Sequence, residues 1–81
     1  MISLLNITEK DNAVIQTINH PDQDMTQRFY DLGFYPGTLV KKVLTSPKGD
    51  PIAYRVRGTT IAIRNYDAAY VEVMIQDGHD S

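Results

Sequence analysis

The 81-residue sequence contains no cysteine, no tryptophan and only two histidines. Without cysteine, the chain forms neither a disulfide nor a thiolate metal site. Its apolar runs fall well short of the roughly 18 residues that a membrane-spanning helix needs, and its first residues show no basic segment or apolar core of a signal peptide. We therefore expect a cytoplasmic domain that is not inserted into a membrane and that depends on its own core for stability.

The groups from which catalytic and metal sites are usually built are also scarce. His20 falls in an expected loop and His79 near the C-terminus, so neither is held against a serine as a catalytic base would be. Asp22 and Asp24 are the carboxylates closest to His20 in the sequence, and we interpret them as helix caps rather than metal ligands. The five glycines are scattered and form no phosphate-binding loop. We expect no catalytic residue, no metal site and no cofactor.

The rest of the composition is typical of one folded domain. Hydrophobic residues make up 42% of the chain and charged residues 22%. The net charge of −2 argues against nonspecific binding to nucleic acid, which requires a basic surface. We expect a single domain over residues 1–81, with its core over about 12–76 and a polar tail over 77–81.

The strongest local signal is a short helix that ends at a glycine. Either Asp22 or Asp24 caps its start, and the spacing of Asp24 to Gln27 resembles a capping box. Gly33 is expected to close the helix in the left-handed conformation. The apolar face of the helix is predicted by residues spaced i, i+4 and i+7, which are Met25, Phe29 and Leu32.

After this helix the sequence has the alternation of short strands. Pro36 and Gly37 predict the turn that leads into them, and Gly58 with Thr59 predicts a tight hairpin. The segment 38–45 breaks the period of two, which indicates a bulge or a sharp bend. We expect strands at 13–18, 38–45, 52–57, 60–64 and 71–75, and a single helical turn at 65–69.

Five short strands, with one helix between the first and the second, predict a mainly β fold: a small SH3-like five-stranded barrel. An OB-fold is the nearest alternative, although it usually needs a longer chain and places its helix later. Residues before 12 are expected to be a lead-in whose Leu4, Leu5 and Ile7 tuck under the barrel. Tyr54 is expected in the core.

Basic and tyrosine side chains are the main candidates for a binding surface. Arg55 and Arg57 are expected to share one face of a strand, with Arg64 at the end of the next strand. They either form a patch that docks on an acidic protein surface or face solvent without a partner. Tyr30 and Tyr35 flank the end of the helix, and tyrosine is favoured at interfaces because it joins apolar area to a polar tip.

Four segments resemble a known family. Residues 28–38 (RFYDLGFYPGT), 47–51 (PKGDP), 56–58 (VRG) and 61–64 (IAIR) are similar, in order and spacing, to the bacterial ferrous-iron transport protein A family, FeoA. The resemblance covers roughly residues 12–75. Phe29 and Ile63 stand where leucine is usual, and Thr59 with Thr60 is more polar than many members are after the hairpin glycine. These departures do not threaten the fold.

The resemblance implies an SH3-like cytoplasmic domain that assists ferrous-iron uptake by a large inner-membrane permease with its own GTP-binding domain, FeoB. It implies action by protein contact, with transport and GTP hydrolysis left to the permease. The residues that we expect to bind this partner are Tyr30, Tyr35, Lys48, Gly49, Asp50, Arg55, Arg57 and Arg64. The residues that we expect to shape turns are Gly33, Pro36, Gly37, Pro51 and Gly58.

Three alternatives stay open. A domain of this kind could bind Pro-rich peptides as eukaryotic SH3 domains do, although the sequence lacks the tryptophan usual in such grooves. It could self-associate as a homo-oligomer through the edges of its sheet. The same fold also forms the C-terminal domain of metal-dependent repressors of the diphtheria-toxin-repressor type, and this sequence shows no DNA-binding helix pair ahead of the barrel.

Overall fold

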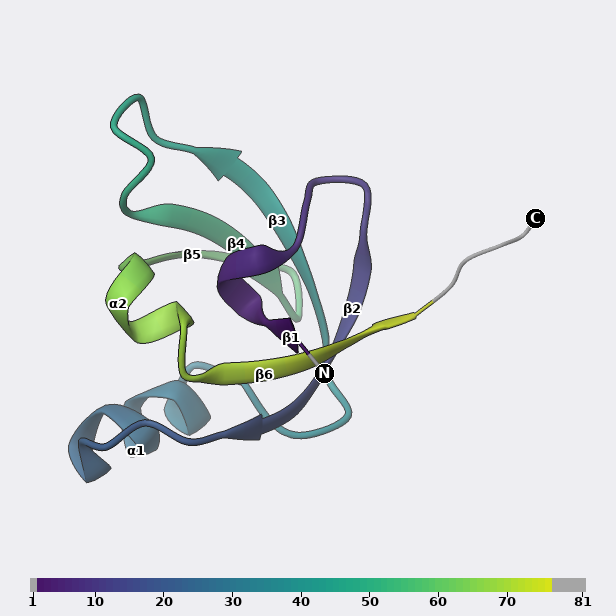
Figure 1. Cartoon of the computed structure of the whole chain (residues 1–81). Coiled ribbons are helices and arrows are strands. Elements are labelled where there is room, and N and C mark those ends of the chain that lie inside the picture. Colours follow the sequence, from purple (N-terminus) through teal and green to yellow (C-terminus); the bar gives the residue numbers. More distant parts are fainter. Residues whose placement is uncertain (1, 77–81) are drawn as a thin grey trace.

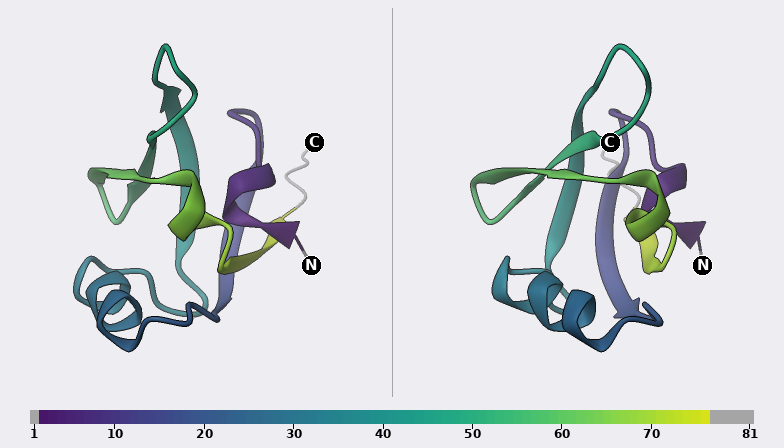
Figure 2. Two further views of the ribbon diagram at one scale, coloured as in Figure 1. Left: turned by 60° about the vertical axis from the view of Figure 1, so that its left-hand side comes forward. Right: turned by 90° about the vertical axis from the view of Figure 1, so that its left-hand side faces the viewer.

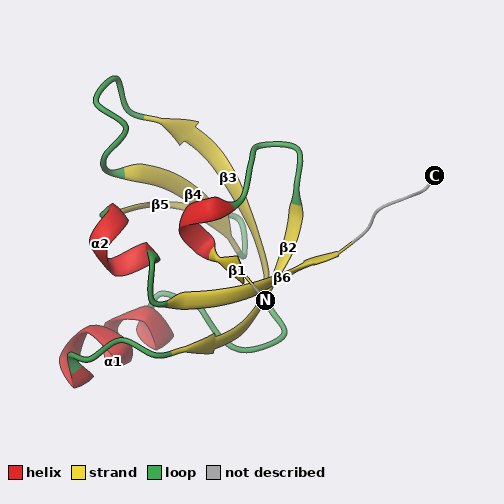
Figure 3. Cartoon of the chain, in the orientation of Figure 1, coloured by secondary structure: helices red, strands yellow, loops and turns green. Residues whose placement is uncertain are grey.

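The computed structural model describes residues 2–76 and shows a strongly curled antiparallel sheet with a short helix at one end (Figures 1 and 3). The polar tail expected over 77–81 lies outside the described residues. Within residues 2–76, no helix is long and apolar enough to cross a membrane. The elements in chain order are β1 (Ile2–Ser3), the 3-10 helix η1 (Leu4–Asn6), β2 (Asn12–Ile18), α1 (Gln23–Asp31), β3 (Leu39–Thr45), β4 (Ile52–Val56), β5 (Thr59–Ile63), α2 (Asn65–Ala68) and β6 (Val71–Gln76).

The strands lie in the order β1-β6-β2-β3-β4-β5, and all neighbours are antiparallel. The expected mainly β fold is confirmed, with α1 and the helical turn α2 where the sequence predicts them. The count of five strands was one too low, because Ile2 and Ser3 pair with Val73 and Glu72. A strand of two residues has no period from which a sequence pattern could predict it.

Irregular pairing accompanies the curl of the sheet. The register shifts between Ile15 and Thr17 in the β2–β6 pair, and between Lys42 and Leu44 in the β3–β4 pair. An extra residue on one strand bends that strand and increases its local twist. The irregularity expected in segment 38–45 is therefore confirmed, and it helps β3 to wrap around the core.

The core fills the inside of the curled sheet. Leu4 and Ile7 are buried in it, so the folded body includes the first residues of the described chain. Tyr54 is fully buried, as expected, and its hydroxyl donates a hydrogen bond to the Leu4 carbonyl oxygen at 3.4 Å. Burial raises the pKa of Tyr54 to about 12, because a phenolate in the core would lose its hydration. The other buried hydrophobic residues are Ala13, Ile15, Ile18, Phe29, Phe34, Val40, Ile52, Val56, Ile63, Ala68, Val71 and Val73.

The start of α1 is fixed by Asp22. Its Oδ1 accepts a hydrogen bond from the Asp24 backbone N–H at 2.9 Å, which makes Asp22 the N-cap. The capping box of Asp24 and Gln27 is therefore wrong, and the Gln27 side chain instead donates to Asp31 at 3.0 Å. Both aspartates are N-cap residue types, and the backbone around them decided between the two.

The end of α1 is a Schellman motif. The Phe34 N–H donates to the Phe29 carbonyl at 3.0 Å, and the Gly33 N–H donates to the Tyr30 carbonyl at 2.9 Å. Gly33 has a φ of 98°, which confirms the predicted left-handed position. Gly37 has a φ of 92°, and its N–H donates to a β2 carbonyl at 2.7 Å. The helix end is thus closed by its own backbone hydrogen bonds, and the following turn is held to β2 by the hydrogen bond of Gly37.

The β4–β5 hairpin turns one residue earlier than expected. Strand β4 ends at Val56, and the turn consists of Arg57 and Gly58, with φ of 54° and 81°. Two successive positive φ angles are those of a type I′ turn, which matches the twist of the flanking strands. The predictions that Arg57 belongs to a strand and that Gly58 with Thr59 forms the turn were therefore wrong. Arginine carries no local signal for the left-handed conformation.

Candidate functional site

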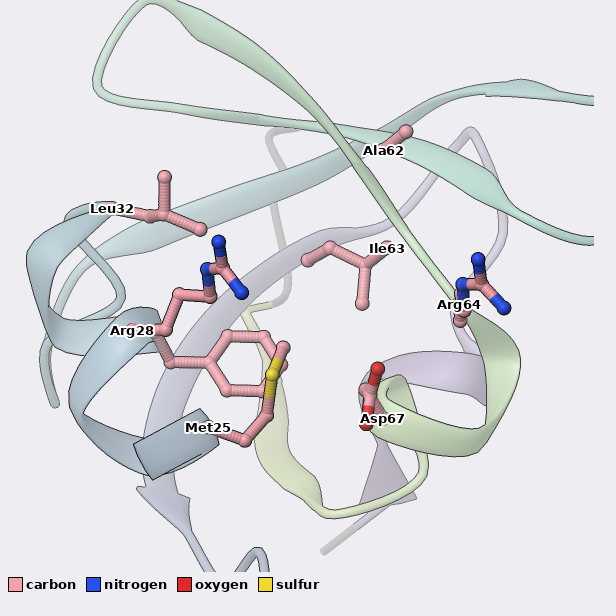
Figure 4. Close-up of a pocket in the computed structure, with 8 residues that line it drawn as sticks. Met25, Arg28, Leu32, Ala62, Ile63, Arg64 and Asp67 are labelled. Carbon is pink, nitrogen blue, oxygen red and sulfur yellow. The ribbon is translucent and has the colours of Figure 1, made fainter. Parts of the chain in front are cut away.

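A hollow of about 270 Å³ lies between α1 and the end of β5, next to α2. In Figure 4, Arg28 and Arg64 stand on opposite sides of this hollow, with Ile63 between them. We call it the α1–β5 groove. It is lined by Met25, Arg28, Phe29, Leu32, Ala62, Ile63, Arg64 and Asp67.

The walls of the α1–β5 groove are apolar, and its charged groups are mostly basic. Phe29 and Ile63 are buried at its base, whereas Leu32 is 38% exposed. Arg28 and Arg64 form no ion pair within residues 2–76, and the Asp67 carboxylate lies 2.7 Å from the His20 Nε2 instead. Asp67, which supplies the carboxylate in the groove, is thus already hydrogen-bonded to His20. An apolar base beside two cations without counter-charges suits an apolar side chain flanked by carboxylates.

His20 ties together the two helices beside the groove. Its Nε2 donates to Asp67 Oδ1 on α2 at 2.7 Å, since its Nδ1 accepts the Asp22 backbone N–H at 3.0 Å and so carries no proton. The ring is buried and packs against Tyr70 and Tyr66, with centroid separations of 5.0 and 5.8 Å. Asp67 lies 47 residues away in the sequence, so no local pattern could have predicted that His20 is held by this carboxylate.

The pKa of Tyr66, which packs against His20, is also shifted. The hydroxyl of Tyr70 raises the pKa of Tyr66, chiefly through a side-chain hydrogen bond to the protonated form. Both ring nitrogens of His20 are occupied in this arrangement. Within residues 2–76, no group of three or more His, Cys, Asp or Glu side chains is placed to hold a metal ion.

The loop at 46–51 is attached to α2 by two of its predicted partner-binding residues. The Asp50 carboxylate accepts the Asn65 backbone N–H at 2.9 Å, and the Gly49 carbonyl accepts the Asn65 side-chain amide at 2.9 Å. Lys48, in contrast, is exposed. A second hollow, also of about 270 Å³, is lined by Asp50, Pro51 and Arg64. Gly49 and Asp50 therefore position α2, and Arg64 lies between both hollows.

These elements match one known family throughout the fold. The FeoA domain model matches residues 2–75. The chain belongs to the FeoA domain family. Among solved structures, the FeoA protein of Chlorobium tepidum is similar with a TM-score of 0.85 and 26% identity, over 98% of this chain and 74% of that protein. The FeoA-like protein of Clostridium acetobutylicum is similar with a TM-score of 0.82 and 28% identity, over 99% of this chain and 92% of that protein.

A third relative supports the predicted architecture. The FeoA of Stenotrophomonas maltophilia, crystallised with zinc, is described as an SH3 domain protein and as a proposed activating factor of ferrous-iron transport. It has a TM-score of 0.81 and 27% identity, over 91% of each chain. The SH3-like fold is thereby confirmed. The manganese regulator SloR, with 8% identity and a TM-score of 0.76, shares the fold alone, and no curated protein matches the sequence.

In this FeoA domain, Arg55 and Arg57 do not share a face. Arg55 lies opposite Lys41 in the β3–β4 register and donates to the Thr60 hydroxyl at 3.3 Å. Arg57, in the hairpin turn, lays its aliphatic stem over Gly33, where an added Cβ would stand 2.9 Å from the Arg57 Cδ. The three predicted arginines are thus in three places: Arg55 on a strand face, Arg57 over the end of α1, and Arg64 in the groove.

The two predicted interface tyrosines do lie together. The rings of Tyr30 and Tyr35 stack at 5.7 Å with an interplanar angle of 13°, and Tyr35 is 50% exposed. Tyr30 belongs to the Schellman motif and Tyr35 follows it directly, so the backbone that ends α1 also positions this pair. Whether they bind a partner stays a prediction.

Sequence reasoning missed Arg28 as a member of the candidate site. Arg28 follows Met25 by three residues and precedes Leu32 by four, so it lies on the same side of α1 as the predicted apolar stripe. A cation inside an apolar stripe, on a helix of only nine residues, is the signal that points to it. The core covers only part of the apolar face of α1, at Phe29, and the rest of that face lines the groove.

Proposed function

We propose that this FeoA domain is a small cytoplasmic accessory protein of bacterial ferrous-iron uptake that acts through contact with an FeoB-type permease and its GTP-binding region. Membership of the family and the description of the Stenotrophomonas relative support a role in ferrous-iron transport. The observation that carries the contact mechanism is the α1–β5 groove, where Arg28 and Arg64 stand over an apolar base and have no counter-charge among residues 2–76. The domain itself catalyses no reaction and associates with the inner membrane only through its partner.

The chemistry of the groove supports binding to a protein. Desolvated apolar contacts at the base supply affinity, and charges at the rim guide encounter and orientation. Arginine is well suited to this task, because its planar guanidinium binds carboxylates in a bidentate manner. The stacked pair of Tyr30 and Tyr35, at the end of α1 and in the turn that follows it, offers a second contact of amphipathic character.

A titration with the permease tests the proposal. The fluorescently labelled chain is titrated with the permease's cytoplasmic GTP-binding domain, in its nucleotide-free, GDP-bound and GTP-analogue-bound states, and with the whole permease in lipid nanodiscs. We expect saturable binding in at least one of these states. No binding in any state, with the membrane portion also present, contradicts the proposed function.

Paired charge variants then locate the contact. The double variant Arg28→Ala/Arg64→Ala is expected to weaken binding by about tenfold, the effect of losing about 1.4 kcal/mol of interaction. Arg55, which the sequence favoured as a contact, lies opposite Lys41 and outside the groove lining. The matched control, Lys41→Ala/Arg55→Ala, removes the same charge from this outer face of the sheet and is expected to bind like the wild type. The opposite ranking would place the contact on the outer face.

A further inference from the structure

Strand β5 forms one edge of the sheet and borders the α1–β5 groove. It pairs with β4 on one side and with no other strand in the described chain. In both views of Figure 2, β5 runs above α1, and the two elements are well separated. Ala62 and Ile63, which line the groove, belong to this edge strand. One wall of the groove is therefore an open strand edge.

The register shows which backbone groups point out of this edge. Val56 and Thr59 flank the two-residue turn and are partners in the ladder, so they form the hydrogen-bonded pair of a tight hairpin. Hydrogen-bonded and non-hydrogen-bonded pairs alternate along an antiparallel ladder. The N–H and C=O groups of Thr60 and Ala62 therefore point away from β4. Within residues 2–76, no turn, loop or cap hydrogen bond uses them.

We propose that β5 accepts an extended acidic segment of a partner protein as an additional strand, with an apolar side chain in the α1–β5 groove and carboxylates against Arg28 and Arg64. This inference rests on the proposed function, because it names the kind of segment that the partner supplies. Strand addition gives affinity through main-chain hydrogen bonds and specificity through side-chain pockets. Alternate side chains of the added strand face the apolar surface of α1, where Met25 and Leu32 lie.

The charges around the edge favour an acidic segment over a second copy of this chain. Arg28 and Arg64 have no ion-pair partner within the described residues. Strand β5 contains no acidic residue and lies between Arg57 and Arg64 in the sequence. Antiparallel pairing of β5 with β5 of a second copy would bring Arg57 of one copy close to Arg64 of the other, and like charges across a contact are unfavourable.

A defined peptide probes the edge directly. The probe is the blocked heptapeptide Asp-Glu-Val-Leu-Val-Glu-Asp, titrated into the full chain labelled with nitrogen-15. We expect the backbone amides of Thr60 and Ala62 to show the largest chemical-shift changes and to become protected from hydrogen exchange. The charge-inverted peptide Lys-Lys-Val-Leu-Val-Lys-Lys is expected to bind at least about tenfold more weakly.

Two variants separate the backbone contribution from the charge contribution. Ala62→Pro removes one N–H from the open edge without removing a donor to β4, and it is expected to weaken binding of the acidic probe by about tenfold. Arg28→Glu/Arg64→Glu, which leaves the backbone unchanged, should weaken binding at least as much. Lys41→Glu/Arg55→Glu carries the same charge change on the outer face and should have little effect. If Ala62→Pro does not fold, the two charge variants still decide.

Three outcomes would overturn the inference. The first is a shift map in which Thr60 and Ala62 do not change. The second is equal affinity for the acidic and basic probes. The third is a peptide-free protein that sediments as a dimer with the Thr60 and Ala62 amides already protected, because a second copy would then occupy the edge. Failure of the proposed function gives a different result: the acidic probe binds at β5 while the permease does not bind at all.

Discussion

The α1–β5 groove and the outer face of the sheet are both basic and partly apolar, but the two surfaces differ in shape and in the hydrogen bonds of their residues. The outer face presents Lys41 beside Arg55, and exposed Leu39 lies near them. Lys41 donates to the Asn12 side chain at 3.0 Å, and Arg55 donates to Thr60 at 3.3 Å. Its cations are thus held by neutral neighbours along paired strands.

The groove differs from the outer face because it is hollowed and because it borders a strand edge. Arg28 and Arg64 stand over a hollow with a buried apolar base, and the adjoining edge strand has backbone groups at Thr60 and Ala62 that no other segment of the described chain pairs with. A cation at a flat, solvated position gains little from a partner's carboxylate. The number of basic residues is therefore less informative about a candidate site than the shape of the surface around them and the hydrogen-bond and ion-pair partners that they have in the described chain.

The largest effect should follow from a substitution at Gly33, which ends the helix that forms one wall of the groove. Gly33→Val is expected to lower the free energy of unfolding by about 2–3 kcal/mol, because a β-branched residue is strained at positive φ. The new side chain would also meet the stem of Arg57, since even its Cβ would stand 2.9 Å from the Arg57 Cδ. Chemical denaturation measures the change. The groove is expected to lose its shape with it, whereas the outer face should not.

Gly37→Val is the matched control for Gly33→Val. Gly37 has a similar φ of 92°, but an added Cβ would have no atom within 4 Å. Backbone strain alone should cost about 1–2 kcal/mol there. Equal losses at Gly33 and Gly37 would show that the contact with Arg57 contributes nothing, and an unchanged stability of Gly33→Val would contradict the role of Gly33 in ending α1.

Alkaline pH should lower the stability of the whole domain, and so affect both surfaces, because Tyr54 lies in the core beneath them. The pKa of Tyr54 is raised to about 12 in the folded chain, against about 10 for an exposed tyrosine. The folded state therefore holds this proton more tightly, and its stability falls as pH rises through the window from about 10 to 12. By pH 11 the loss should be about 1 kcal/mol. Thermal unfolding of wild type and Tyr54→Phe from pH 8 to 11 checks it, because the variant should lack this component.

A smaller effect is expected on the α2 side of the groove. Asp50→Ala removes the acceptor of the Asn65 N–H at the start of α2 and should lower the free energy of unfolding by about 1 kcal/mol. Hydrogen exchange should quicken at Asn65, while the amides of β3 stay protected. Lys48→Ala, in the same loop but exposed, is the control and should change neither measurement. A loss in Lys48→Ala equal to that in Asp50→Ala would contradict this interpretation of the loop.

The smallest effect is expected on the outer face. Lys41→Ala/Arg55→Ala should change the free energy of unfolding by less than about 0.5 kcal/mol, because exposed hydrogen bonds of charged side chains contribute little to stability. The two like charges face each other across the β3–β4 ladder, so removing both also relieves a small repulsion. A loss above about 1 kcal/mol would show that these side chains hold the strands together, which would erase the distinction between the two surfaces.

The sequence alone determined the elements whose signals are local. Gly33 with its preceding apolar stripe predicted α1 and its end, and alternation predicted the strands that form most of the sheet. Asp22 and Asp24 were equivalent candidates for the cap, and only the structure showed that Asp22 is used. The turn at Arg57 was missed because its conformation follows from the twist of the hairpin rather than from the residue type.

Tertiary structure alone decided which side chains share a site. Arg28 and Arg64 lie on either side of one groove although they are 36 residues apart in the sequence, and His20 contacts a carboxylate 47 residues away. Residue types and periods report on neighbours within a turn or a strand. The hollow, the open edge of β5 and the absence of a counter-charge at the arginines within the described chain arise only when the sheet curls, because its register and bulges set the distances between segments.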